Sequence, residues 1–365
     1  MNRLPSPGPS IWRRFSSTSS STIAVRPAPS KERHHAPIPN HSFPHGYSLT
    51  GVHCGVKKKS SVLDLAVILS TSPNSTAAAA CFTRNAFKAA PVLVSKDVLE
   101  KSAGRVRAIV TNSGCANAVT GKQGLADAWA MVKATDALLP KKLNSHDTND
   151  TLVMSTGVIG QNLPISKILS GISSLVPSSL GSDFAAWERA AKAFMTTDTF
   201  PKIRARTFSL GGHTFRMAGM DKGAGMIHPD MGPPSDLGQL HATLLGCILT
   251  DAAVSPKALQ SALTYAVDRS FNSISVDGDM STNDTIIVLA NGAAAGETKE
   301  IDEHDPLFNA FRDELTSFAA ELAQLVVRDG EGATKFVTVT VEVGRYGLST
   351  AYIIKLIRAG GTDFC

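Results

Sequence analysis

The apolar stretches of this chain are short, and they alternate with longer segments whose apolar residues recur at helical spacing. Strand-length runs lie at 62–69, 106–110, 286–289 and 336–343, and helical patterns lie at 125–139, at 184–194, after Ser255-Pro256 and at 307–327. No stretch approaches the ~20 apolar residues that a membrane span requires, so no membrane partner is expected. The alternation predicts a mixed α/β fold that begins near Gly46.

The first thirty residues carry most of the basic surplus of the chain. They contain four arginines and no acid, and without them the formal net charge of +5 falls to about +1. An Arg-rich, Ser-rich, acid-free start is typical of a mitochondrial transit peptide. We therefore expect residues 1–40 to be a transit peptide and a disordered leading segment addressed to the mitochondrial matrix. The alternative is a disordered tail without an address, and neither case predicts a nucleic-acid partner.

Cysteine and histidine spacing disfavours a disulfide framework and a metal site, with a metal site among the early histidines as the alternative to a solvated segment there. The five cysteines lie far apart without a C-x-x-C pair, which predicts reduced thiols and no disulfide framework. Five histidines precede Cys54 in a proline-rich stretch that lacks metal-ligand spacing. The segment from Asp277 resembles a calcium loop but lacks the glycine at its sixth position and the glutamate at its twelfth. We expect neither a metal nor a cofactor.

Segment 221–246, DKGAGMIHPDMGPPSDLGQLHATLLG, combines features that self-cleavage requires. A Pro/Gly/Ser stretch predicts an exposed loop, and Ala242-Thr243 follows it directly before an apolar run. The Thr243 hydroxyl could attack the preceding carbonyl, and hydrolysis of the resulting ester would free the Thr243 amine. Such an amine has a pKa of about 7.7–8.0 and can serve as base for its own hydroxyl. An ordinary loop-to-strand junction is the alternative.

Several blocks of the chain resemble the ornithine acetyltransferase family, whose members are bifunctional in arginine biosynthesis. The cleavage block KGAGMIHPDM…ATLLG is accompanied in consistent order by NSGCANA, MSTGVIG, MTTDTFPK, SFNSISVDGDMSTNDT and DGEGATK. The likeness covers residues 45–342, and the spacer 232–241 resembles that of fungal members. It implies layered mixed sheets flanked by helices, in the N-terminal-nucleophile-like, self-cleaving fold shared with related aminopeptidases.

The resemblance also implies catalytic roles. Thr243 is expected to be the nucleophile that accepts the acetyl group, after cleavage between Ala242 and Thr243. Thr156 and Gly157, which follow an apolar run, are expected to form the oxyanion hole. Donors placed there stabilise a tetrahedral oxyanion by about 3–4 kcal/mol each. An ordinary turn is the alternative for this pair.

Three further positions match substrate contacts of the family: Thr197, Lys222 and Glu331. A cation can bind the α-carboxylate of an amino acid, and a carboxylate can bind its amino groups. Lys222 could instead be a solvated loop charge, and Glu331 could be a carboxylate at a helix end. Thr196 remains open as the alternative to Thr197.

The implied enzyme is a glutamate N-acetyltransferase that moves acetyl from N-acetylornithine to glutamate by a ping-pong path. Acetyl-CoA is expected as a second acetyl donor, on resemblance alone. The resemblance divides the folded chain into an α part, 45–242, and a β part, 243–342, which assemble as a heterotetramer of two each. A hydrolase with an N-terminal threonine, either an aminopeptidase or an amidohydrolase, is the first alternative.

The last residues depart from the family pattern. From residue 343 the chain reads VGRYGLST and ends at Cys365, without counterparts of the late Asn and Thr that contact substrate in the family. We expect 343–365 to be a non-family tail, produced by truncation or by translation of an unspliced intron. An inactive product is therefore the second alternative.

Overall fold

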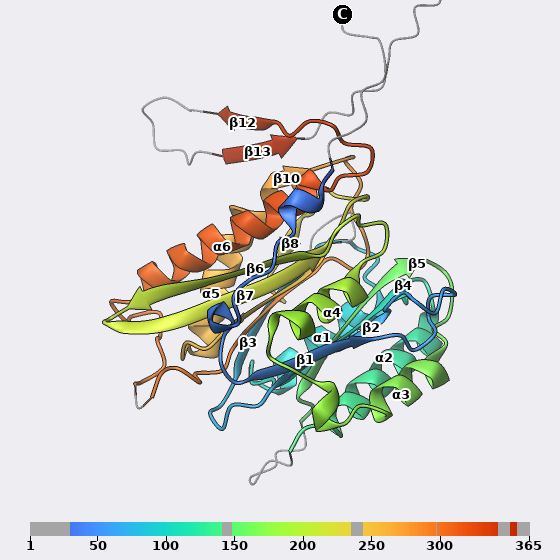
Figure 1. Ribbon diagram of the computed structural model, residues 1–365, viewed down its shortest axis with the longest axis horizontal. Helices are drawn as coiled ribbons and strands as arrows, with labels where there is room; N and C mark the ends of the chain where they lie inside the picture. Colours follow the sequence, from blue (N-terminus) through green and yellow to red (C-terminus); the bar gives the residue numbers. More distant parts are fainter. Residues whose placement is uncertain (1–29, 141–147, 235–243, 297, 342–350, 356–365) are drawn as a thin grey trace, which may run out of the picture.

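The computed structural model describes residues 30–140, 148–234, 244–296, 298–341 and 351–355. Within these ranges the elements form successive layers of helices and sheets (Figure 1). The expected α/β class, with mixed sheets flanked by helices, is confirmed. Among the described residues, no helix has both the length and the apolarity to cross a membrane.

One layer is a four-stranded sheet of order β1-β2-β4-β5. Its strands are β1 (Tyr47–Val52), β2 (Leu65–Ser70), β4 (Ala108–Cys115) and β5 (Thr151–Val158). The first two pairings are antiparallel and the last is parallel. Helix α1 (Ala90–Lys101) lies along the edge strand, where the Ser95 hydroxyl donates to the Val153 carbonyl at 2.7 Å and accepts from its amide at 2.8 Å. These bonds satisfy backbone groups that an open edge would leave unpaired.

A second layer is a six-stranded sheet of order β6-β7-β9-β11-β3-β8. Its strands are β6 (Lys202–Leu210), β7 (His213–Lys222), β9 (Leu245–Thr250), β11 (Thr285–Ala290), β3 (Ala77–Thr83) and β8 (Met231–Gly232). Strands β9 and β11 are parallel, and the other pairs are antiparallel. Its central strands are buried on both faces: Cys247 and Leu249 belong to one hydrophobic core and Ile248 to the other. Because both faces of these central strands are buried, their sequences are continuous apolar runs and do not alternate with polar residues.

Helices separate and cover these sheets. Helix α4 (Phe184–Phe194) packs between them, with Trp187 and Phe194 buried. Helices α2 (Gly121–Asp136) and α3 (Ile165–Ser173) lie on the four-stranded side, and α5 (Pro256–Asp268) and α6 (Phe308–Arg328) on the outer face of the six-stranded sheet (Figure 1). The Ser255 hydroxyl accepts the Ala258 amide at the start of α5, the cap expected from the sequence.

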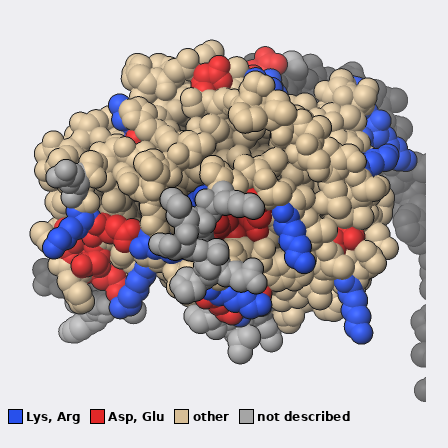
Figure 2. Space-filling view, turned by 90° about the horizontal axis from the view of Figure 1, so that it is seen from below, with Lys and Arg blue, Asp and Glu red and all other residues tan. Residues whose placement is uncertain are grey.

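A small third sheet pairs β10 (Ile274–Ser275) with β13 (Ala351–Lys355) and β13 with β12 (Thr338–Val341). Four short 3₁₀ turns complete the described elements: η1 (Glu32–His34), η2 (Asn40–Ser42), η3 (Pro177–Ser179) and η4 (Phe271–Ser273). On the face of the molecule seen in Figure 2, acidic and basic side chains are interspersed on a surface that is mostly neither.

The leading segment makes specific contacts upstream of Gly46, where the sequence suggested that folding begins. The Phe43 ring is buried and stacks on Trp187, with ring centroids 5.0 Å apart. The His35 ring lies 3.0 Å from the Glu188 carboxylate on α4. Residues 30–45 therefore belong to the packed structure, because an aromatic anchor and polar partners on α4 hold them.

Candidate functional site

A cavity of about 670 Å³ opens where strands of both large sheets end. Every predicted site residue that the structure describes lines it: Thr156, Gly157, Thr197, Lys222 and Glu331. The remaining lining residues are Lys57, Gly114, Val158, Thr196, Gly225, Met226, Asp277 and Asp279. Because Thr196 and Thr197 both face the cavity, the choice between them stays open. Ala242 and Thr243 lie outside the described residues.

The end of β5 supplies Thr156 and Gly157. The chain passes here from buried to exposed, and the pairing of β4 with β5 shifts register at Gly114. Gly157 has φ +126°, and a Cβ built on it would lie 2.3 Å from the Gly114 carbonyl carbon. Both facts require glycine at this position, since a side chain would collide with the backbone of the neighbouring strand.

Lys222 reaches the same point from the end of β7. Its side chain is buried, and its Nζ lies 3.4 Å from the Thr156 hydroxyl. Burial lowers the pKa of Lys222, although the nearby Asp198 carboxylate opposes this shift. The sequence alternative, a solvated loop charge, is therefore wrong for Lys222, because its amine is buried beside a hydroxyl.

The loop after Lys222 is shaped around Glu331. The Glu331 amide donates to the Ala224 carbonyl at 2.6 Å, and a Cβ on Gly225 would lie 2.7 Å from the Glu331 carboxyl carbon. Asp277, on the calcium-like segment, accepts the amides of Met226 and Ile227 at 2.6 and 2.8 Å. Asp277 thus binds backbone N–H groups of the loop and holds Met226 at φ +56°.

The described structure resumes at Leu244, the residue after Thr243 and directly before β9. The Leu244 amide donates to the Asp284 carboxylate, and the next residue, Leu245, pairs with Lys222. Asp284 is fully buried, and its second carboxylate oxygen has no hydrogen-bond partner among the described residues. Burial raises the pKa of Asp284 well above its ordinary value. Leu244, the residue that follows Thr243 in sequence, therefore lies next to Asp284 and one residue before the partner of Lys222.

Sequence reasoning missed a second lysine in the cavity. The Lys57 ammonium donates to the carbonyls of Leu63 and Met195 at 2.8 and 2.7 Å, and burial lowers its pKa to about 8. In the sequence it begins a run of three lysines, a pattern typical of a solvated loop. Among the described residues, no group of His, Cys, Asp and Glu could hold a metal ion.

Comparisons with known proteins place this geometry in context. The ArgJ family matches residues 48–357. The chain is 72% identical over 340 residues to the arginine biosynthesis bifunctional protein ArgJ, mitochondrial, of Postia placenta, covering 91% of this chain and 72% of that protein. The protein of the same name from Coprinopsis cinerea is 68% identical, with 92% and 71% covered. Ornithine acetyltransferase from Mycobacterium tuberculosis, solved with ornithine, is 37% identical over 52% of this chain and 95% of that one, with a TM-score of 0.44.

Proposed function

The chain belongs to the ArgJ family, and on that premise we propose that it transfers acetyl from N-acetylornithine to glutamate through an ester on Thr243. It is an acyltransferase of arginine biosynthesis and is mitochondrial, as its relatives are named. One observation carries the residue assignment. Five residues expected from four separate sequence blocks line a single cavity, and one of them, Lys222, pairs with Leu245, two residues after Thr243.

In the first half-reaction the Thr243 oxygen attacks the acetyl carbonyl of N-acetylornithine. The oxyanion that forms receives hydrogen bonds from Thr156 and Gly157, at the end of β5. The C–N bond then breaks, and ornithine leaves with the proton that the Thr243 hydroxyl gave up. The acetyl group stays on Thr243 as an ester.

In the second half-reaction the amine of glutamate attacks this ester. N-acetylglutamate leaves, and the Thr243 hydroxyl regains a proton. Lys222 binds the α-carboxylate of either substrate, and Glu331 binds the amino groups of ornithine. Thr197, or its neighbour Thr196, supplies a hydroxyl contact. The free amine of Thr243 serves as base in both halves once the bond after Ala242 has been cut.

Two finer assignments rest on family membership. We propose that acetyl-CoA is a second donor, so that N-acetylglutamate also forms directly. We further propose a heterotetramer of two α and two β pieces, whose mass would be about twice the 38.4 kDa of one chain and which light scattering can measure. The address is the mitochondrial matrix.

The first prediction tests the nucleophile. Wild-type protein should run as two pieces on a denaturing gel and should release ornithine from N-acetylornithine when glutamate is present. Thr243→Ala should run as one chain and lose transfer by at least about a thousandfold, because the ester cannot form. Normal turnover by this variant would refute the mechanism.

The acceptor requirement separates transfer from hydrolysis. A transferase stalls after one acetyl group per site when glutamate is withheld, whereas an aminopeptidase or amidohydrolase continues to release ornithine into water. Steady ornithine release without glutamate, at the rate seen with it, would favour the hydrolase.

A further inference from the structure

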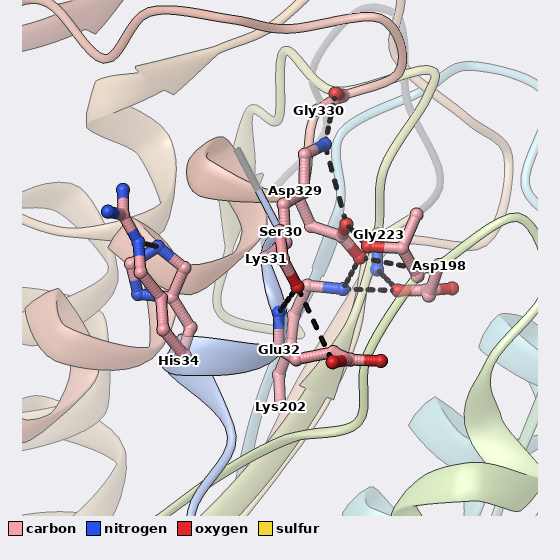
Figure 3. A network of polar contacts seen from close by, with 11 residues as sticks. Ser30, Lys31, Glu32, His34, Asp198, Lys202, Gly223, Asp329 and Gly330 are labelled. Carbon is pink, nitrogen blue, oxygen red and sulfur yellow. Dashed lines mark hydrogen bonds and ion pairs between the residues drawn. The ribbon is translucent and has the colours of Figure 1, made fainter. Parts of the chain in front are cut away.

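A buried network of charges joins segments that carry cavity-lining residues (Figure 3). Lys202, the first residue of β6, has a side chain with no exposed surface. Its ammonium donates to Asp198 at 2.6 Å and to Asp329 at 2.7 Å. Although burial alone would lower the pKa of Lys202, the charges of Asp198 and Asp329 raise it, so this lysine stays charged.

The two carboxylates bind backbone amides of the segments that line the cavity. Asp198 accepts the amides of Gly223, at 2.7 Å, and Thr196, at 2.9 Å. Asp329 accepts the amide of Thr199 at 2.9 Å and also its hydroxyl. The network therefore joins the Thr196–Thr197 turn, the Gly223 loop and the turn that carries Glu331, which lies two residues after Asp329.

Asp329 has a second cation beside it, in addition to Lys202. Lys31 provides it from the leading segment. Its Nζ lies 3.6 Å from Asp329 and donates to the Gly330 carbonyl at 3.0 Å, although 299 positions separate the two residues in sequence. Its side chain is 19% exposed, so solvent reaches it only partly. Charge-assisted bonds of this kind are stronger than neutral ones.

We propose that Lys31 is a positioning residue of the acyl-transfer site, which holds the Asp329–Glu331 turn and so sets where Glu331 meets the substrate. This inference rests on the proposed function. The leading segment thereby contributes to substrate binding, because Lys31 adds to the network that aligns Glu331 with Thr197 and Lys222. Lys31 is not among the residues that line the cavity, so it acts on binding through Glu331 and leaves the acyl-transfer chemistry itself intact.

The test compares Lys31→Met with Lys31→Arg and with a control, Lys101→Met. The Lys101→Met variant also loses an ion pair, to Asp97 at 2.7 Å, but the Lys101 side chain is 67% exposed and is not among those that line the cavity. In Lys31→Met we expect KM for N-acetylornithine to rise about three- to tenfold and kcat to stay within about twofold. This is the result expected when a variant loses binding free energy that is equal in the ground state and the transition state.

Lys31→Arg should restore KM, because it returns the positive charge, and Lys101→Met should match wild type. A merely structural role for Lys31 would lower the fraction of active protein, and so kcat, without raising KM. An unchanged KM in Lys31→Met would overturn the inference. Lys202→Met removes the centre of the network and should raise KM further than Lys31→Met does. Because the Lys31 side chain is partly exposed, the comparison of the Lys31 variants does not depend on whether Lys202→Met folds.

A second readout distinguishes this inference from the proposed function. Should wild-type protein transfer no acetyl group, the proposed function fails, and hydrogen exchange then decides the role of Lys31. Peptides covering 196–199 and 329–331 should exchange faster in Lys31→Met than in Lys101→Met. Equal exchange in the two variants would overturn the inference in that case.

Discussion

Neighbouring residues on β7 show how burial changes the chemistry of a single side chain. Lys222 points into the cavity beside Thr156, whereas the next residue back, Asp221, has a fully buried carboxyl whose two oxygens lack hydrogen-bond partners among the described residues. Burial raises the pKa of Asp221 well above its ordinary 3.8, although the charge of Lys202 opposes this. Burial therefore favours the neutral acid form of Asp221 in the folded protein over a wider pH range than in the unfolded chain.

This protonation predicts a pH-dependent effect of Asp221→Asn. Above pH 3.8 the Asp221 carboxyl is ionised in the unfolded chain but protonated in the folded one, so folding takes up a proton. The stability of the wild type therefore falls as pH rises above 3.8 towards the raised folded pKa. Asparagine removes this dependence. Relative to wild type, the unfolding free energy of Asp221→Asn should rise by up to about 1.4 kcal/mol per pH unit between pH 3.8 and the raised folded pKa.

Urea unfolding at pH 5, 6 and 7 measures this difference. The matched control is Asp313→Asn, because the Asp313 carboxylate on α6 is 62% exposed and pairs with Arg312 at the surface. The unfolding free energy of Asp313→Asn should differ from that of wild type by less than about 1 kcal/mol at each pH. A constant difference between Asp221→Asn and wild type across this range would contradict a buried, protonated Asp221.

At the scale of elements, the cavity forms where β5 and β7 end and where the turn after α6 returns. The parallel pairing of β4 with β5 brings Gly114 against Gly157, and the two backbones approach too closely for any side chain. The strand ends thus carry Thr156 and Lys222, and the connecting segments that the sheets position carry Thr197 and Glu331.

Gly157→Ala should therefore damage both the sheet and the site. Its Cβ would press on the Gly114 backbone, which can move only if β4 and β5 separate, and a positive φ costs alanine about 1–3 kcal/mol in addition. We expect a loss of at least about 3 kcal/mol in unfolding free energy and at least about a hundredfold lower kcat. Denaturant unfolding and steady-state kinetics measure the two effects.

Gly160→Ala is the control for backbone strain alone. Gly160 also has a positive φ, +78°, but nothing lies within 4 Å of a Cβ built there. The unfolding free energy of this variant should fall by about 1 kcal/mol, and its kcat should stay at the wild-type value. A Gly157→Ala enzyme that behaves like Gly160→Ala would show that close approach of β4 and β5 is unnecessary for transfer.

At the scale of the whole molecule, the leading segment links the end of α6 to α4. Lys31 contacts Gly330, the Arg204 guanidinium donates to the His34 carbonyl at 3.2 Å, and His35 contacts Glu188. Figure 1 shows this segment, in dark blue, running from the end of α6 towards the four-stranded sheet. The leading segment therefore contacts both the end of α6 and helix α4. Its sequence, rich in proline and histidine, gives no indication of these contacts.

These contacts predict where import processing stops. The protein recovered from mitochondria should begin at or before Lys31, because later cleavage would remove the second cation of the network. N-terminal mass spectrometry measures the position. A fusion of residues 1–40 to a reporter, without a tag ahead of Met1, should reach the matrix as a control for targeting. A fully active enzyme that starts after Lys31 would contradict the prediction.

Much of the architecture follows from local pattern. The helix expected at 184–194 coincides with α4, and those expected after Ser255 and at 307–327 match α5 and α6 to within a residue at their starts or ends. The helix expected at 125–139 begins earlier, at Gly121, because its first turn is polar and gives no apolar signal. The expected strands at 62–69 and 286–289 overlap β2 and β11. The part boundaries 45–242, 243–342 and 343–365 stay predictions.

The sequence alone determined the fold class, the family and five of the residues that line the cavity, because periodicity and motifs lie within single segments of the chain. Only the tertiary structure decided which charges meet. Lys57 faces the Met195 carbonyl, Lys202 meets Asp329 across 127 positions, and Lys31 reaches Gly330 across 299. Burial and charge partners depend on segments far apart in the chain, so the lowered pKa of Lys57 and the network behind Glu331 leave no trace in local spacing.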